Sequence, residues 1–204
     1  PIWNPRPNGQ KPGRWPTVND MSKILIADNS PWLAALTARK IEAELNLRVR
    51  TVGSYSDAVQ MVHDSSPEFS TALTGLCFPD ASVGAMVDLL LAKDIPTIVF
   101  SGKSDDRLRD ELLSRKVVDY VLKTAPRSLD HIVSLIREIQ RNPAIKLLVV
   151  EGSPTRRSRI TERLEVRRYQ VFEASDGYEA LRLLDQQPDI HIVIIDYDMP
   201  DMDG

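Results

Sequence analysis

KILIADNSP, at residues 23–31, returns as KLLVVEGSP at residues 146–154, 123 positions further along the chain. In both stretches a lysine precedes four apolar residues, an acidic residue and, one position later, a Ser-Pro pair. The apolar run is typical of a strand that is buried on both faces, and Ser-Pro is typical of a helix start. SYSDAVQMV (54–62) is echoed within ASDGYEALRLL (174–184), so the sequence indicates a duplicated unit.

Downstream of the first stretch, short apolar runs alternate with amphipathic stretches. We predict strands at 23–27, 47–52, 70–76, 96–101 and 117–123, and helices at 31–44, 56–65, 82–93, 105–115 and 128–141. The last helix carries one apolar face, made of Leu129, Ile132, Val133, Leu135, Ile136 and Ile139. Because short parallel strands need helical crossovers, this alternation predicts an α/β fold with a doubly wound parallel sheet.

The second copy is shorter than the first. It supplies a strand at its start, a helix at 154–166, a strand at 169–174, a helix at 177–186 and a strand at 191–196. We therefore expect a complete domain at 22–142 and the N-terminal half of a second domain at 145–204, in a fragment of a longer protein. Almost no linker separates the two copies, so we expect a fixed angle between them.

Residues 1–21 stand apart from both copies. They hold five of the 14 prolines and two of the three tryptophans, without helical or strand periodicity. We interpret them as an extended leader or tag-like segment, with Met21 as the natural start. The alternative is an interaction arm that uses Trp3 and Trp15.

Composition excludes several classes of function. A net charge of −3 provides no strongly basic surface, so direct nucleic-acid binding is not expected. The apolar runs are far too short for a membrane span, and because no charged stretch is followed by an apolar one, we expect no secretory signal. The single cysteine, Cys77, cannot form an internal disulfide and favours a reducing, cytoplasmic compartment; we expect it to be buried or half-buried.

Candidate functional residues follow the strands, because ligands of open parallel sheets gather at the carboxyl ends of the strands. In the second copy these residues are Glu151 and Gly152, after its first strand, and Asp196, after its third. The third strand continues into IIDYDMPDMDG (194–204). This loop resembles the receiver domain of two-component response regulators in the residues Asp196, Met199, Pro200, Met202, Asp203 and Gly204.

The resemblance covers nearly the whole chain after the leader and implies a flavodoxin-like (βα)5 fold with strand order 2-1-3-4-5. It implies that Asp196 accepts a phosphoryl group and that Mg²⁺ assists. The ion would be held by Glu151, Asp196 and the backbone carbonyl of Asp198. Since Gly152 stands where the family has a second acidic residue, we expect a weakened Mg²⁺ site.

The first copy resembles a degenerate receiver. Gly75 stands at the acceptor position and has no nucleophile, and Asp80, five residues further on, cannot occupy the same point. The other positions of this pocket are Asp28 and Asn29 for the acidic pair, Ser101 for the hydroxyl, Lys123 for the lysine and Tyr120 for the switch aromatic. We expect Lys123 to pair with Asp28 in a structural role.

The leading interpretation is a signalling input module. A histidine kinase or phosphotransfer protein would phosphorylate Asp196, and the first copy would dock, dimerise or gate. Homodimerisation would use its fourth helix, fifth strand and fifth helix. The resemblance extends to tandem receivers that precede diguanylate cyclase (GGDEF) output domains.

Two alternatives belong to other classes. Both copies could be unphosphorylated adaptors, or Asp196-Tyr197-Asp198 could be the Asp-x-Asp motif of a haloacid-dehalogenase-type phosphatase. The three histidines are isolated in sequence, so no catalytic histidine is proposed. The arginines of the helix at 154–166 are interpreted as a solvated face, or alternatively as a docking surface; they are Arg156, Arg157, Arg159 and Arg163.

Overall fold

The computed structural model describes residues 23–65 and 69–197. The strands of the first copy are β1 (Lys23–Ala27), β2 (Arg48–Val52), β3 (Phe69–Thr74), β4 (Thr97–Ser101) and β5 (Asp119–Leu122). Its helices are α1 (Pro31–Leu45), α2 (Tyr55–Ser65), α3 (Ala85–Ala92), α4 (Asp106–Ser114) and α5 (Ser128–Arg141). The elements of the second copy are β6 (Lys146–Val150), α6 (Pro154–Val166), β7 (Gln170–Ala174), α7 (Gly177–Gln186) and β8 (Ile192–Ile195).

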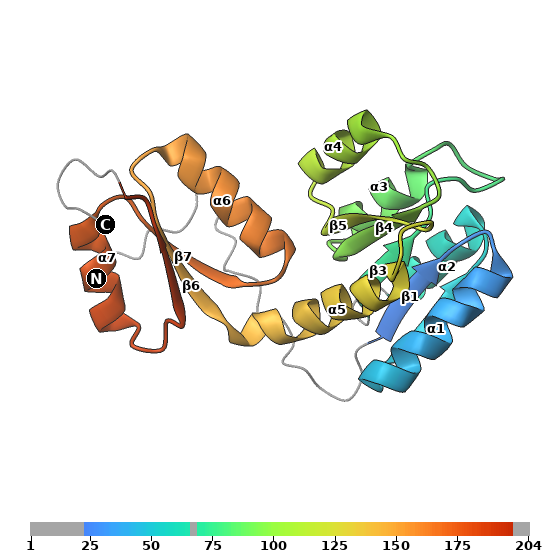
Figure 1. Cartoon of the computed structure of the whole chain (residues 1–204), viewed down its shortest axis with the longest axis horizontal. Helices are drawn as coiled ribbons and strands as arrows, with labels where there is room; N and C mark the ends of the chain where they lie inside the picture. The colour runs from blue at the N-terminus through green and yellow to red at the C-terminus, as the bar shows by residue number, and fades with distance from the viewer. Residues whose placement is uncertain (1–22, 66–68, 198–204) are drawn as a thin grey trace.

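The first copy is a five-stranded parallel sheet with the order β2-β1-β3-β4-β5 (Figure 1). This order confirms the predicted flavodoxin-like topology. Alternate residues of β1 enter opposite sides of the core: Ile24 and Ile26 pack with α1 and α5, whereas Leu25 and Ala27 pack with α2 and α3. Both faces of the sheet are therefore covered by helices, and the carboxyl ends of the parallel strands lie together at one end of the sheet.

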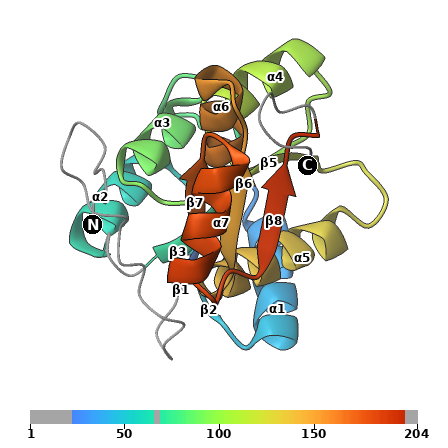
Figure 2. The same ribbon diagram turned by 90° about the vertical axis from the view of Figure 1, so that its left-hand side faces the viewer.

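The described part of the second copy is a three-stranded parallel sheet with the order β7-β6-β8. Its helices α6 and α7 lie on opposite faces of the sheet (Figure 1), and β8 forms one edge (Figure 2). All four residues of β8 are apolar, and they keep 37–47% of their surface exposed. The three-stranded sheet fits an incomplete second copy of the same fold.

The two copies meet directly at the end of α5. This helix passes through a short 3-10 turn, Asn142–Ala144, into β6 (Figure 1). The buried Asn142 side chain donates to the carbonyl of Arg167 at 2.8 Å, and Arg167 lies 3.8 Å from Glu138 of α5. Next to it, burial lowers the pKa of the Arg168 guanidinium to about 10, an effect that Asp94 of the first copy opposes. The C-terminal end of α6 thus packs against the first copy.

Three sequence expectations need correction or lie outside the described residues. The helix expected at 82–93 begins only at Ala85, because Gly84 adopts a φ of 85°, which a helix interior does not accept. Cys77 is exposed rather than buried, although its neighbours Leu76 and Phe78 in the loop after β3 are buried. The segment 1–21 lies outside the described residues. Within the described residues, no helix is both long and apolar enough to span a membrane.

Candidate functional site

Gly75 and Asp196 occupy equivalent points at the carboxyl ends of the two sheets. Each follows a strand paired with the first strand of its copy. The amide of Gly75 donates to the carbonyl of Ala27 at 2.9 Å, and the amide of Asp196 donates to the carbonyl of Val150 at the same distance. The same backbone position therefore carries a carboxylate in the second copy and no side chain in the first.

The acidic residues after β1 and β6 are also equivalent. Both Asp28 and Glu151 are buried, with 4% of their surface exposed. Each carboxylate accepts a hydrogen bond from the amide two residues on, at 2.9 Å from Ser30 and 2.8 Å from Ser153. These serines are the N-caps of α1 and α6, so the turn that starts each helix also positions the carboxylate.

In the first copy, Lys123 closes this pocket. Its ammonium lies 2.5 Å from the carboxylate of Asp28 and 5.6 Å from the centroid of the Phe100 ring. The predicted pairing of Lys123 with Asp28 is confirmed. The pocket consequently contains one buried carboxylate and one cation that neutralises it, and no nucleophile at Gly75.

The remaining residues predicted for the first pocket lie around this pair. Ser101 is buried at the end of β4, and its hydroxyl accepts from the amide of Lys103 at 3.1 Å. Tyr120 is buried on β5 and donates its hydroxyl proton to the carbonyl of Lys103 at 2.8 Å. Asn29 is exposed. Ser101 and Tyr120 are both tied to the loop after β4, so this loop connects the hydroxyl position with the aromatic one.

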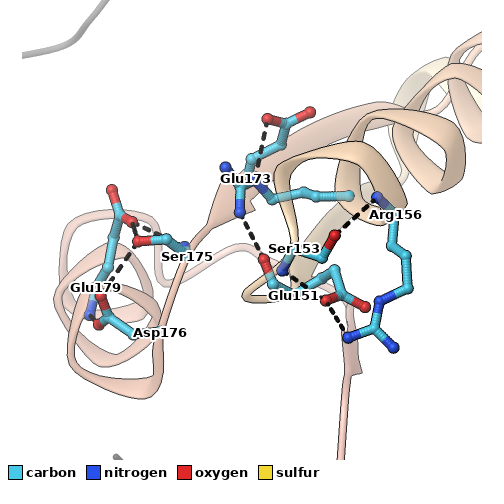
Figure 3. Close-up of polar contacts among 8 residues, drawn as sticks. Glu151, Ser153, Arg156, Glu173, Ser175, Asp176 and Glu179 are labelled. Atoms are coloured by element: carbon cyan, nitrogen blue, oxygen red, sulfur yellow. Dashed lines mark hydrogen bonds and ion pairs between the residues drawn. The ribbon is translucent and has the colours of Figure 1, made fainter. Parts of the chain in front are cut away.

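In the second copy, an arginine takes the place that Lys123 has in the first. The Arg156 Nη2 atom lies 3.0 Å from Oε1 of Glu151 and 3.1 Å from Oδ2 of Asp196. Figure 3 shows Arg156 reaching from α6 back to Glu151. Arg157 turns elsewhere: it donates to the carbonyl oxygen of Glu151 and lies 3.6 Å from Glu173.

The sequence interpretation of these arginines as a solvated face is therefore wrong for Arg157, whose side chain is only 18% exposed, and incomplete for Arg156. Arg156 is largely exposed, but its guanidinium bridges two carboxylates of the site. A signal was present in the sequence, because long side chains on a helix lean toward its N-terminus. Arg156 is the third residue of α6, so its side chain leans toward the loop that carries Glu151.

Beside this site, the loop between β7 and α7 forms a network of its own (Figure 3). Asp176 is the N-cap of α7 and accepts from the amide of Glu179 at 2.8 Å, which lowers the pKa of Asp176. Glu179 in turn accepts from the amide and hydroxyl of Ser175. These contacts account for the acidic residues of this loop as helix-capping groups.

The donor set for Mg²⁺ consists of few groups. Among the described residues, no group of three or more His, Cys, Asp or Glu side chains could hold a metal ion. Glu151 and Asp196 come close enough for one guanidinium nitrogen to contact both, and Mg²⁺ is often held by one or two carboxylates and several waters. The two carboxylates therefore fit Mg²⁺ when Arg156 is displaced. Asp198, whose carbonyl was predicted as a third ligand, lies outside the described residues.

Comparison with known proteins agrees with this geometry. Residues 147–204 match the family model of the response regulator receiver domain. The chain is 43% identical over 61 residues to the chemotaxis protein CheY1 of Helicobacter pylori, a match that covers 29% of this chain and 49% of CheY1. The chain thus spans about half the length of the curated relatives it matches.

Two solved structures resemble nearly the whole chain. Both are described as two-component system response regulator/GGDEF domain proteins. One is 32% identical, with 90% of this chain and 74% of that chain covered and a TM-score of 0.81. The other is 34% identical, with 90% and 73% covered and a TM-score of 0.79. This chain belongs to the response regulators of two-component systems.

Proposed function

We propose that this chain is the input module of its response regulator and that Asp196 is the phosphoacceptor. The observation that carries the proposal is the pair of equivalent backbone points after β3 and β8. Asp196 supplies a carboxylate at one of them, beside Glu151, whereas Gly75 supplies nothing at the other. Phosphorylation is therefore assigned to the second copy alone.

The reaction requires a nucleophilic oxygen and neutralisation of charge on the phosphoryl group. A carboxylate oxygen of Asp196 attacks the phosphorus of a phosphohistidine on a histidine kinase or phosphotransfer protein. The O–P bond forms while the P–N bond breaks, and the departing imidazole nitrogen takes up a proton. Mg²⁺, held by Glu151, Asp196 and the carbonyl of Asp198, would neutralise phosphoryl charge when bound.

The first copy acts in this proposal as a docking or dimerisation unit. Its acidic pocket is filled by the pair of Asp28 and Lys123, so the fold is kept without phosphotransfer. We further propose a cytoplasmic location and a diguanylate cyclase as the C-terminal output. The GGDEF descriptions of the two structural relatives support this output. Membership in the response regulators favours a regulatory role for Asp196 over the phosphatase alternative.

The test is to incubate the full-length protein with Mg²⁺ and acetyl phosphate and to map the modified peptide by mass spectrometry. We expect one added phosphoryl group, on Asp196, that hydroxylamine removes because it is an acyl phosphate. Asp196→Asn removes the modification, whereas Asp185→Asn, at an exposed carboxylate of α7, retains it. If the protein without substitutions takes up no phosphoryl group at Asp196, the adaptor interpretation replaces this proposal.

A further inference from the structure

A single nitrogen of Arg156 contacts both carboxylates of the second site. Its Nη2 atom lies 3.0 Å from Glu151 and 3.1 Å from Asp196. A cation that bridges the same two carboxylates would need the space that this nitrogen occupies. The arginine and a divalent ion therefore cannot use both carboxylates at once.

Helix geometry places Arg156 in this position. The N-cap Ser153 accepts from the amide of Arg156, which fixes the first turn of α6 directly after the acidic loop. Side chains of a helix lean toward its N-terminus, so the guanidinium reaches back over that loop. The next residue, Arg157, contacts the backbone of Glu151 and the side chain of Glu173 instead.

The fold itself does not require an arginine here. The equivalent residue of the first copy is Leu33, whose amide donates to the N-cap Ser30 in the same way. Leu33 is partly buried and packs against the apolar core of its copy. Arg156, in contrast, keeps 62% of its side chain exposed. Its side chain contributes charge to the site rather than packing to the core.

The charges at this site favour the binding of a second cation. One guanidinium faces two carboxylates, so these three groups keep a net negative charge that attracts a divalent cation. Because the guanidinium is mostly exposed, it can rotate into water and remain hydrated there. In the first copy, by comparison, Lys123 neutralises Asp28 one to one and is only 23% exposed.

We propose that Arg156 gates the divalent-cation site of the second receiver. The guanidinium and the ion compete for Glu151 and Asp196, and the ion binds when Arg156 swings into solvent. The ligand class is a small divalent cation with oxygen preference, Mg²⁺ or Mn²⁺. This inference rests on the proposed function, since it assumes that Asp196 belongs to a metal-assisted site.

The experiment measures Mn²⁺ binding to the full-length protein by the loss of the electron paramagnetic resonance signal of the free ion. The second-site ion is the one that Asp196→Asn removes. Arg156→Met removes the competing charge but keeps an unbranched side chain, and Arg159→Met removes the same charge from an exposed position of the same helix. We expect Arg156→Met to tighten Mn²⁺ binding roughly ten-fold, while Arg159→Met leaves it within about two-fold, as for a screened surface charge.

Three results would overturn the gate, and they differ in meaning. If Mn²⁺ binds the unmodified protein and Arg156→Met with equal affinity, the gate is wrong and the metal site stands. If no variant binds an ion that depends on Asp196, the metal-assisted site itself fails, and the gate with it. A weaker affinity in Arg156→Met would also contradict the gate, because the arginine would then assist the ion.

Discussion

In the first copy, the carboxylate of Asp28 pairs with Lys123, which follows β5 at the edge of the sheet. In the second copy, the equivalent carboxylate of Glu151 pairs with Arg156 of the adjacent helix α6. Asp28 and Lys123 are both largely withdrawn from water. Glu151 is as buried as Asp28, but Arg156 is mostly exposed and also contacts Asp196. The same backbone thus supports a closed ion pair in one copy and an exchangeable one in the other.

Lys123→Met breaks the closed pair and has the largest expected effect. It leaves the buried carboxylate of Asp28 without its cation, which we expect to lower the free energy of unfolding by about 2–3 kcal/mol. Urea denaturation followed by circular dichroism measures this loss. Lys123→Met combined with Asp28→Asn should recover part of it. A single-variant loss below about 0.5 kcal/mol would show that the pair does not stabilise the first copy.

Gly75→Asp gives the first copy the carboxylate that it lacks. There is space for a side chain at Gly75, since a Cβ added there would lie 3.9 Å from its nearest neighbours, Ala27 O and Asp28 Oδ2. The new charge beside Asp28 should lower stability by about 1–2 kcal/mol, and millimolar Mg²⁺ should restore it by binding the folded state. Thermal unfolding with and without Mg²⁺ tests this. An equal loss in both conditions would mean that Lys123 keeps the pocket closed to the ion.

Arg156→Met is the matched change in the second copy and should affect stability much less than Lys123→Met. The guanidinium is 62% exposed, and such ion pairs contribute about 0–1 kcal/mol. The same urea measurement applies. If Arg156→Met costs as much stability as Lys123→Met, the contrast between a closed and an exchangeable pair is wrong.

Asp80→Asn tests the capping of α2, whose first amides donate to Asp80, and it has the smallest expected effect on stability. Hydrogen bonds from the amides of Tyr55 and Ser56 lower the pKa of Asp80, so its stabilising charge is present above about pH 4 and is lost as the pH falls through the lowered pKa. Asp80→Asn should therefore show a lower urea midpoint at neutral pH and a smaller fall toward acid pH. An unchanged acid profile would contradict this role.

Asp176→Asn provides the parallel test in α7, where the capping carboxylate comes from the N-cap residue of the same helix.

The sequence predicted most of the fold because each strand and helix carries a repeated local signal. The Ser-Pro pairs that begin at Ser30 and Ser153 predict helix starts, and both serines are N-caps in the structure. The start of α3 was predicted three residues early, because a positive φ at Gly84 is a property of the loop and not of hydrophobic periodicity. The exposure of Cys77 was missed because its neighbours Leu76 and Phe78 are buried in the core, and the direction of each side chain in this loop is not set by hydrophobic periodicity.

The sequence predicts a site residue correctly where the position of that residue after a strand is enough to locate its side chain. Lys123 and Asp28 follow two strands of one sheet, so their meeting could be expected. Arg156 could be assigned only in part: its place in the first turn of α6 directs it toward the loop of Glu151, but Arg157 shares that turn, and only the rotamers decide which of the two reaches Glu151 and Asp196. Side-chain direction within the first turn is the information that the sequence lacks.

The most direct test of the central claim, that only the second copy is a phosphorylation switch, is an amide NMR titration of the full-length protein with beryllofluoride and Mg²⁺, which mimic a phosphorylated aspartate. We predict shifts of the amides of Glu151, Gly152 and Asp196, with those of Asp28 and Gly75 unchanged. Asp196→Asn should abolish the shifts. Shifts at Asp28 and Gly75, or none at Asp196, would contradict the assignment of the switch to the second copy.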